Sequence, residues 1–309
     1  MNLRVVVTGA FGYSGSRIAR RLLAAGHSVL TLTNSSGRDH PLRERVSVEP
    51  YNFAEPEKLA RSLEGYDVLI NTYWVRFDHR CFDHATAVQN TLTLFASAQR
   101  AGVGRIVHVS ITNPEEASPL PYFDGKGRLE RALRESGIAH TILRPAVLFG
   151  DGDILINNIA WALRRLPCFG VFGDGEYKLQ PIHVEDFAEL AVREAAATGN
   201  CTIEAIGPET FTYRELAREI GRIIGCPRPV FSVPPWFGYA AGRLVGWWHR
   251  DEFITREEVT GLMQNRLWVD APPAGRTRLT EWAVRHADSL GRTYANELAR
   301  RRPASSVRP

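Results

Sequence analysis

A glycine-rich turn lies between the first predicted strand and the first predicted helix of this 309-residue chain. Residues 3–8 form a β-branched run typical of a buried strand, and Ile18, Ala19 and Leu22 then share one helical face. Of the three glycines between them, the first permits a tight turn, the second lets the backbone approach an anion, and the third lets the helix pack closely on the strand. N–H groups at the start of the helix favour a negative ligand. The pattern predicts a pyrophosphate site at Gly9, Phe11, Gly12, Tyr13 and Gly15.

Short apolar runs and helical patterns alternate through the first half of the chain. We expect strands at 3–8, 29–33, 46–48, 67–70, 105–109 and 140–143, and helices ending at Gly26, spanning 56–64, ending at Gly102 and spanning 122–136. This alternation predicts an α/β fold, a Rossmann-like doubly wound parallel sheet covered on both faces. The later chain is rich in Gly and Pro, with a strand at 201–206 and helices near 216–223, 256–265 and 280–300. It predicts a smaller, mostly helical C-terminal cap region.

These patterns suggest a division of the chain into domains. We predict a dinucleotide-binding domain at 1–150, to which 178–206 return. Residues 151–177 and 207–300 are expected to form a substrate-binding cap region, and 301–309 a disordered tail.

The residues after the second strand bear on the choice between NAD and NADP. A carboxylate there would bind the ribose 2′-OH, whereas an arginine suits a 2′-phosphate. The chain has no carboxylate at this strand end, and we predict that Asn34, Ser35 and Arg38 contact the cofactor. Arg17 is a second candidate for the residue that holds the 2′-phosphate. The alternative is that Arg38 is a solvated loop residue. The sequence favours NADP over NAD.

Charge and composition limit the class of protein. The net charge is +4 and the arginines are mixed with carboxylates, which argues against nucleic-acid binding. The chain starts directly in a strand-like segment, with no pattern of a cleaved leader, and no cysteine or histidine cluster has metal-site spacing. The apolar segment 233–248 is short of a membrane span and is interrupted by Pro and Gly, so we expect it to be buried or to line a cleft. We therefore expect a cytoplasmic protein without stable membrane insertion or bound metal.

The chain resembles the short-chain dehydrogenase/reductase superfamily, in its extended and atypical branches, over nearly its whole length. The residues that carry the resemblance are the glycine turn at 8–15, Asp67, Asn90, the run 122–126, Arg144-Pro145, and 173–175 followed by 181–186. Epimerase/dehydratase-like proteins, NmrA-like regulators and relatives of the nucleotide-binding accessory subunit of respiratory complex I are the most similar groups. Members often dimerise, so the resemblance implies a possible homodimer.

The resemblance also implies a catalytic pair. Tyr122 and Lys126 are four residues apart and share one helical face. A nearby ammonium lowers the pKa of a phenol, so Tyr122 could exchange a proton with a substrate oxygen during hydride transfer, while Lys126 also binds the nicotinamide ribose. Ser110, or else Thr112, would donate a hydrogen bond to the substrate carbonyl. Asn90 either supports a water relay or is a structural amide.

Two features depart from the family pattern. Gly125 precedes Lys126 where relatives carry Ser or Ala, which predicts a looser helix start. The run 176–181 lacks the arginine expected of nucleotide-sugar epimerases. Aromatic residues instead suggest a small apolar or aromatic carbonyl or alcohol as substrate, or else fill the core of the cap region. They are Tyr73, Trp74, Phe123, Phe149, Trp161, Trp236 and Phe237. The sequence thus predicts an NAD(P)-dependent oxidoreductase or epimerase, the alternative being a non-catalytic NAD(P)-binding sensor or assembly protein.

Overall fold

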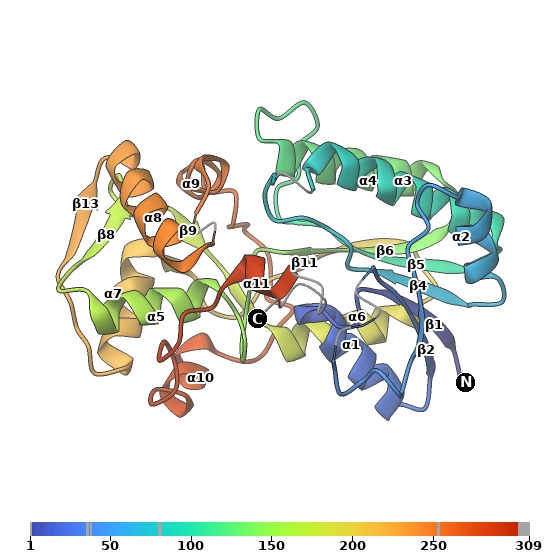
Figure 1. The fold of residues 1–309 in the computed structure, drawn as a ribbon, viewed down its shortest axis with the longest axis horizontal. Helices are drawn as coiled ribbons and strands as arrows, with labels where there is room; N and C mark the ends of the chain where they lie inside the picture. Colours follow the sequence, from blue (N-terminus) through green and yellow to red (C-terminus); the bar gives the residue numbers. More distant parts are fainter. Residues whose placement is uncertain (1, 35–36, 38, 80–81, 252–253, 302–309) are drawn as a thin grey trace. The chain divides into compact units, whose positions relative to one another are not determined.

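The computed structural model describes residues 2–34, 37, 39–79, 82–251 and 254–301. The chain divides into two compact units, each built from separate stretches of sequence (Figure 1). The first unit takes 2–144 and 187–203 of the described residues, and the second takes 145–186 and 204–301. The domain boundaries expected from the sequence stay predictions.

The first unit is built on a seven-stranded sheet in the order β11-β6-β5-β4-β1-β2-β3. The pairs β1–β2, β1–β4, β2–β3, β4–β5 and β5–β6 are all parallel. The carboxyl ends of these strands therefore meet at one edge, where ligands bind in open α/β sheets. The strands are β1 (Arg4–Thr8), β2 (Ser28–Leu32), β3 (Ser47–Glu49), β4 (Val68–Asn71), β5 (Arg105–Val109), β6 (Ala139–Pro145) and β11 (Cys201–Ala205).

Helices cover both faces of this sheet. In Figure 1, α2 (Pro56–Leu63), α3 (His84–Arg100) and α4 (Pro121–Glu135) lie along one face, and α1 (Tyr13–Ala24) and α6 (Val184–Ala195) lie along the other. The central strands β1, β2 and β4 are mostly apolar runs because both of their faces are buried. One core cluster joins strand residues such as Val6, Leu69 and Ile106 to helix residues such as Leu94 and Leu129. The Rossmann-like α/β fold expected from the sequence is confirmed.

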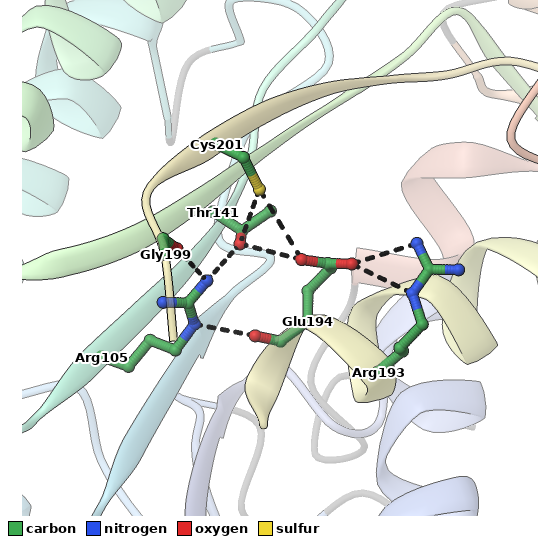
Figure 2. A network of polar contacts seen from close by, with 6 residues as sticks. All are labelled: Arg105, Thr141, Arg193, Glu194, Gly199 and Cys201. Atoms are coloured by element: carbon green, nitrogen blue, oxygen red, sulfur yellow. Dashed lines mark hydrogen bonds and ion pairs between the residues drawn. The ribbon is translucent and has the colours of Figure 1, made fainter. Parts of the chain in front are cut away.

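A buried polar network holds the returning segment 187–203 against the amino-terminal ends of the strands (Figure 2). Arg105, at the start of β5, donates to the carbonyl oxygens of Glu194 (2.8 Å) and Gly199 (3.0 Å), and to the hydroxyl of Thr141. The Thr141 hydroxyl donates in turn to the Glu194 carboxylate at 3.2 Å, next to Cys201. A buried guanidinium is costly unless it is hydrogen-bonded, so the acceptors of Arg105 Nε and Nη2 hold the segment in place, although Nη1 has no hydrogen-bond partner among the described residues.

The second unit combines helices with short paired strands. β7 pairs parallel with β10, β8 parallel with β13, and β9 antiparallel with β12. Phe149 and Trp161 lie in its apolar core, so their role is packing, as one of the two sequence-based alternatives had it. Its elements are β7 (Val147–Phe149), α5 (Leu155–Arg165), β8 (Phe169–Phe172), β9 (Lys178–Leu179), β10 (Pro181–His183), β12 (Phe211–Thr212), α7 (Tyr213–Ile223), β13 (Val230–Val233), α8 (Pro235–His249), α9 (Arg256–Met263), α10 (Leu279–Arg285) and α11 (Glu297–Arg301).

Two expectations for this later chain are wrong. Residues 280–300 are not one helical stretch, because the carbonyl oxygens between α10 and α11 accept hydrogen bonds from side chains of α5 instead: Leu290 accepts from Arg164, and Thr293 from Asn157. The apolar segment 233–248 is not buried as a whole, because it forms the helix α8, which exposes Trp236, Phe237, Trp247 and Trp248. No helix in the described part of the chain is long and apolar enough to cross a membrane.

Candidate functional site

The glycine turn takes the form that a dinucleotide pyrophosphate requires. Gly9 has φ +70°, and its amide donates to the carbonyl of Leu32, which holds the turn against β2. A Cβ on Gly15 would lie 2.9 Å from the carbonyl carbon of Gly9, so only glycine lets α1 start this close to the turn. Gly12 precedes α1 and offers no side-chain cap, and the first helical turn has no acidic residue. The start of α1 can therefore accept an anion.

Some of the other predicted cofactor residues lie in the described part of the chain and others do not. Phe11 is buried beside His40, with ring centroids 5.1 Å apart, and the Arg17 guanidinium lies 5.2 Å from the centroid of the Tyr13 ring. The Asn34 side chain accepts a hydrogen bond from the Tyr51 amide at 3.3 Å. Ser35 and Arg38 lie outside the described residues. The predicted preference for NADP stays a prediction.

Trp74, which follows β4, contacts both members of the predicted catalytic pair on α4. Tyr122 is half-buried and meets the Trp74 ring edge-on at a centroid distance of 5.6 Å. The Lys126 ammonium lies 4.2 Å from the centroid of the same ring, within cation–π range. A Cβ on Gly125 would come within 2.9 Å of Trp74 Cη2, so the glycine that departs from the family pattern makes room for the indole. Tyr122, Lys126 and Trp74 thus form one cluster.

Lys126 is only 2% exposed and donates from Nζ to the carbonyl oxygen of Val109 at 2.7 Å. This bond places the amine at the carboxyl end of β5, on the same edge of the sheet as the glycine turn. Burial lowers the pKa of Lys126 to about 7, with the nearby Glu130 carboxylate acting in the opposite direction. An amine with this pKa exchanges protons readily near neutral pH, which is the property required of an acid–base group.

A chain of buried polar side chains crosses the same edge of the sheet. The Thr8 hydroxyl donates to Asn71 Oδ1 at 3.0 Å, and Asn71 Nδ2 donates to His108 Nδ1 at 3.1 Å. Burial, with a further contribution from the charge of Lys126, holds the pKa of His108 well below its ordinary value. His108 is therefore neutral at neutral pH and accepts through Nδ1. The chain connects the strand that enters the glycine turn with the surroundings of Lys126.

The two candidates for the third catalytic residue are both buried. Ser110 donates its hydroxyl hydrogen to Glu130 at 2.6 Å, and Thr112 is fully buried. Glu130 also accepts two hydrogen bonds from Arg144, at 2.9 and 2.6 Å, and one from Arg134. Burial alone would raise the pKa of Glu130, but the hydrogen bonds from Arg144, Ser110 and Arg134 hold it below its ordinary value. The single hydroxyl proton of Ser110 is thus committed to Glu130.

The sequence did not single out three of these groups: Glu130, His108 as part of a polar chain, and Trp74 as the neighbour of the catalytic pair. The only signal for Trp74 was Gly125, since a glycine inside a helix commonly marks a close neighbour. Asn90, left open between a water relay and a structural amide, donates to the Tyr73 hydroxyl at 2.9 Å. Tyr73 also lies against Tyr51 and Phe53.

Comparison with known proteins shows which proteins this chain is similar to. Residues 9–158 match the NAD(P)H-binding family model, a range that includes the glycine turn and the Tyr122–Lys126 pair. Among curated proteins, the chain is 27% identical to the photosystem II assembly factor Ycf39 of Synechocystis, over 75% of this chain and 71% of that protein. The resemblance stated from the sequence is confirmed.

Two further relatives show how varied the roles of such proteins are. A mitochondrial NADH dehydrogenase [ubiquinone] 1 alpha subcomplex subunit 9 of Arabidopsis thaliana is 26% identical, over 72% of this chain and 60% of that protein. A 2-alkyl-3-oxoalkanoate reductase of Stenotrophomonas maltophilia is 25% identical, over 73% of this chain and 77% of that protein. This chain therefore spans less than two thirds of the length of the mitochondrial subunit.

Solved structures share the fold. A nucleoside-diphosphate-sugar epimerase from Staphylococcus aureus superposes with a TM-score of 0.71 at 16% identity, over 92% of this chain and all of that one. UDP-glucose 4-epimerase from Thermotoga maritima superposes with a TM-score of 0.63 at 20% identity, over 76% of this chain and 86% of that one. At these identities the likeness concerns the fold alone.

Proposed function

We propose that the chain is an NAD(P)-dependent oxidoreductase that interconverts a carbonyl and an alcohol on a small apolar or aromatic substrate. One observation carries the proposal: Lys126, with a pKa lowered to about 7, is one helical turn from the half-buried Tyr122. The carbonyl that Lys126 contacts is at the sheet edge that also bears the glycine turn. Strongly perturbed amines of this kind are concentrated at functional sites.

The chain's own residues divide the work as follows. The start of α1 and the glycine turn would hold the dinucleotide by its pyrophosphate, and the dinucleotide would supply the hydride-transfer chemistry. In the reductive direction, Tyr122 donates its hydroxyl proton to the substrate oxygen. Lys126 then returns a proton to the tyrosinate, and the low pKa of its ammonium makes that transfer favourable. Trp74 lies against both side chains and holds them in place.

We further propose that the cofactor is NADP and that Arg38 pairs with its 2′-phosphate. The absence of a carboxylate at the end of β2 supports this choice. Calorimetry that compares NADPH with NADH tests it: tighter binding of NADPH is expected, and equal affinities would contradict it.

Tyr122→Phe tests the catalytic role directly. The variant is expected to lose at least about a hundredfold in kcat on a panel of apolar and aromatic carbonyls, because the proton donor is gone. Its affinity for NADPH should be retained, because the hydroxyl is not part of the glycine turn. Tyr66→Phe is the matched control, since Tyr66 precedes β4 and lies at the opposite edge of the sheet. A Tyr122→Phe variant as active as the wild type would disprove the assignment of Tyr122 as the proton donor.

The second candidate function is dinucleotide binding without turnover. It is favoured by the Ser110–Glu130 hydrogen bond, which removes the expected donor to a substrate carbonyl, and by the burial of Thr112. The relatives include a protein named as an assembly factor. If the wild-type chain binds NADPH but reduces no carbonyl of the panel, this second function replaces the first.

A further inference from the structure

Helix α8 in the second unit exposes large aromatic side chains. Trp236 is 71% exposed, Phe237 52%, Trp247 78% and Trp248 78%. Phe231, in the strand β13 just before the helix, is also exposed. The expected position of such residues is the core, and their concentration on one short element marks a surface that binds something.

The helix turns its glycines inward and its aromatics outward. Gly242 and Gly246 are buried, and a Cβ on Gly238 would lie 2.5 Å from Phe172 Cε1 of β8. These glycines recur every four residues and so follow one side of the helix. Two aromatic pairs, Trp236 with Trp247 and Phe237 with Trp248, are each separated by about three helical turns. Both pairs lie on the side of the helix away from the glycines. The glycine side therefore packs against the protein, and the exposed side carries indole and phenyl rings.

Charge defines the kind of partner. No Asp or Glu occurs from Pro227 to Arg250, whereas Arg243 and Arg250 are exposed on or beside α8. The Arg256 guanidinium lies 5.0 Å from the centroid of the Tyr239 ring and adds a third cation beside the helix. Asp251, the first carboxylate after the helix, is buried, with its oxygens accepting from Tyr294, Glu297 and Leu298. The exposed large side chains that the structure describes on α8 are therefore aromatic or cationic, whereas Glu257 and Glu258 follow Arg256 on the neighbouring helix α9.

We propose that α8 adsorbs flat on the surface of an anionic phospholipid bilayer. Tryptophan is enriched at the boundary between headgroups and acyl chains, where its ring is buried and its N–H reaches polar groups. Basic side chains beside it are attracted to anionic headgroups. The helix has 15 residues, which is too short to span a bilayer and suits an orientation parallel to the surface. A second copy of the chain fits less well, since a symmetric contact through this face would bring its arginines together.

Flotation of the full chain with vesicles tests the proposal. The chain is expected to float with vesicles of phosphatidylcholine and phosphatidylglycerol, and to bind far less to phosphatidylcholine alone. Trp247→Ala/Trp248→Ala should lower the partition coefficient at least about tenfold, since two large apolar contacts are lost. Arg243→Gln should lower it about fivefold on anionic vesicles, and added salt should reduce the difference.

Val284→Ala is the matched control, because Val284 is an exposed apolar residue of the same unit on α10, and it should bind like the wild type. Circular dichroism and NADPH binding verify that each variant is folded, independently of any turnover. The proposal is overturned if the wild type does not float with anionic vesicles, or if the double tryptophan variant floats equally well. It is also overturned if the tryptophans instead drive self-association, detected by sedimentation without lipid.

Discussion

Replacing Lys126 by Met should stabilise the protein, and the gain should depend on pH. The Lys126 side chain is almost completely buried, and burial lowers its pKa from the ordinary 10.5 to about 7. The folded chain therefore pays a desolvation cost for the ammonium that the unfolded chain does not. Methionine has a similar length and no charge, so it removes this cost, although it also removes the hydrogen bond to Val109 and the contact of the charge with Trp74.

The size of the pH dependence follows from linkage. Between about pH 7 and pH 10.5 the unfolded chain binds the Lys126 proton and the folded chain does not, so the stability of the wild type rises with pH in this window. Each pH unit is worth about 1.4 kcal/mol. The free-energy gain of Lys126→Met over the wild type should therefore be constant below about pH 7 and shrink by about 1.4 kcal/mol per pH unit above it. The hydrogen bond and the packing shift the whole curve without changing this slope.

Urea unfolding of the apo protein at about pH 6, 7, 8 and 9, followed by circular dichroism, measures the difference. Lys58→Met is the control: Lys58 lies in the same unit, on α2, and its side chain is half exposed and paired with Glu55 at 3.4 Å. Its difference from the wild type should vary little with pH. A Lys126→Met curve as flat as that of the control would refute the reasoning, because it would mean that water reaches the ammonium in the folded chain.

Two further predictions concern the glycine turn and the buried carboxylate. Gly15→Ala should abolish calorimetrically detectable NADPH binding, because the added Cβ would displace the turn at Gly9. Gly199→Ala is the control and should bind NADPH normally, because a Cβ at Gly199 meets nothing within 4 Å. Normal NADPH binding by both variants would contradict the pyrophosphate site. Glu130→Ala should lower the free energy of unfolding by about 3–5 kcal/mol in urea, because it leaves Arg144 without its bidentate partner in a partly buried site. Because the pKa of Glu130 is lowered in the folded chain, its carboxylate stabilises the fold above the pKa of the unfolded carboxyl, and this stabilisation is lost as the pH falls through the pKa of the folded chain. The destabilisation caused by Glu130→Ala should therefore become smaller in acid. A destabilisation that stays the same in acid would contradict this explanation.

The first unit could be predicted well because its local signals agree with one another. Strands such as β1 are buried on both faces and have mostly apolar sequences, and the helices between the strands begin or end near Pro and Gly. The second unit gave weaker signals. Helix α8 carries Gly at 238, 242 and 246, and glycines inside a helix normally argue against one. Gly238 serves close packing against Phe172 of β8, a tertiary effect that no local pattern contains.

The site was predictable where its chemistry follows from spacing. Tyr122 and Lys126 share a helical face by their separation alone, and the glycine turn follows from its place between strand and helix. The burial of Lys126 and the engagement of Ser110 were not predictable. Both depend on residues distant in the sequence: Trp74 lies 52 positions before Lys126, and Glu130 lies 20 positions after Ser110.

The fastening of residues 187–203 by Arg105 has a practical consequence for dissecting the molecule. A fragment ending at residue 144 would lose β11 and α6, leave β6 as an open sheet edge, and strip the Arg105 guanidinium of its acceptors on Glu194 and Gly199. The first unit therefore cannot be obtained by truncating the chain after residue 144. Splicing 187–203 back on through a short artificial connection, rather than truncating, is the way to obtain it alone.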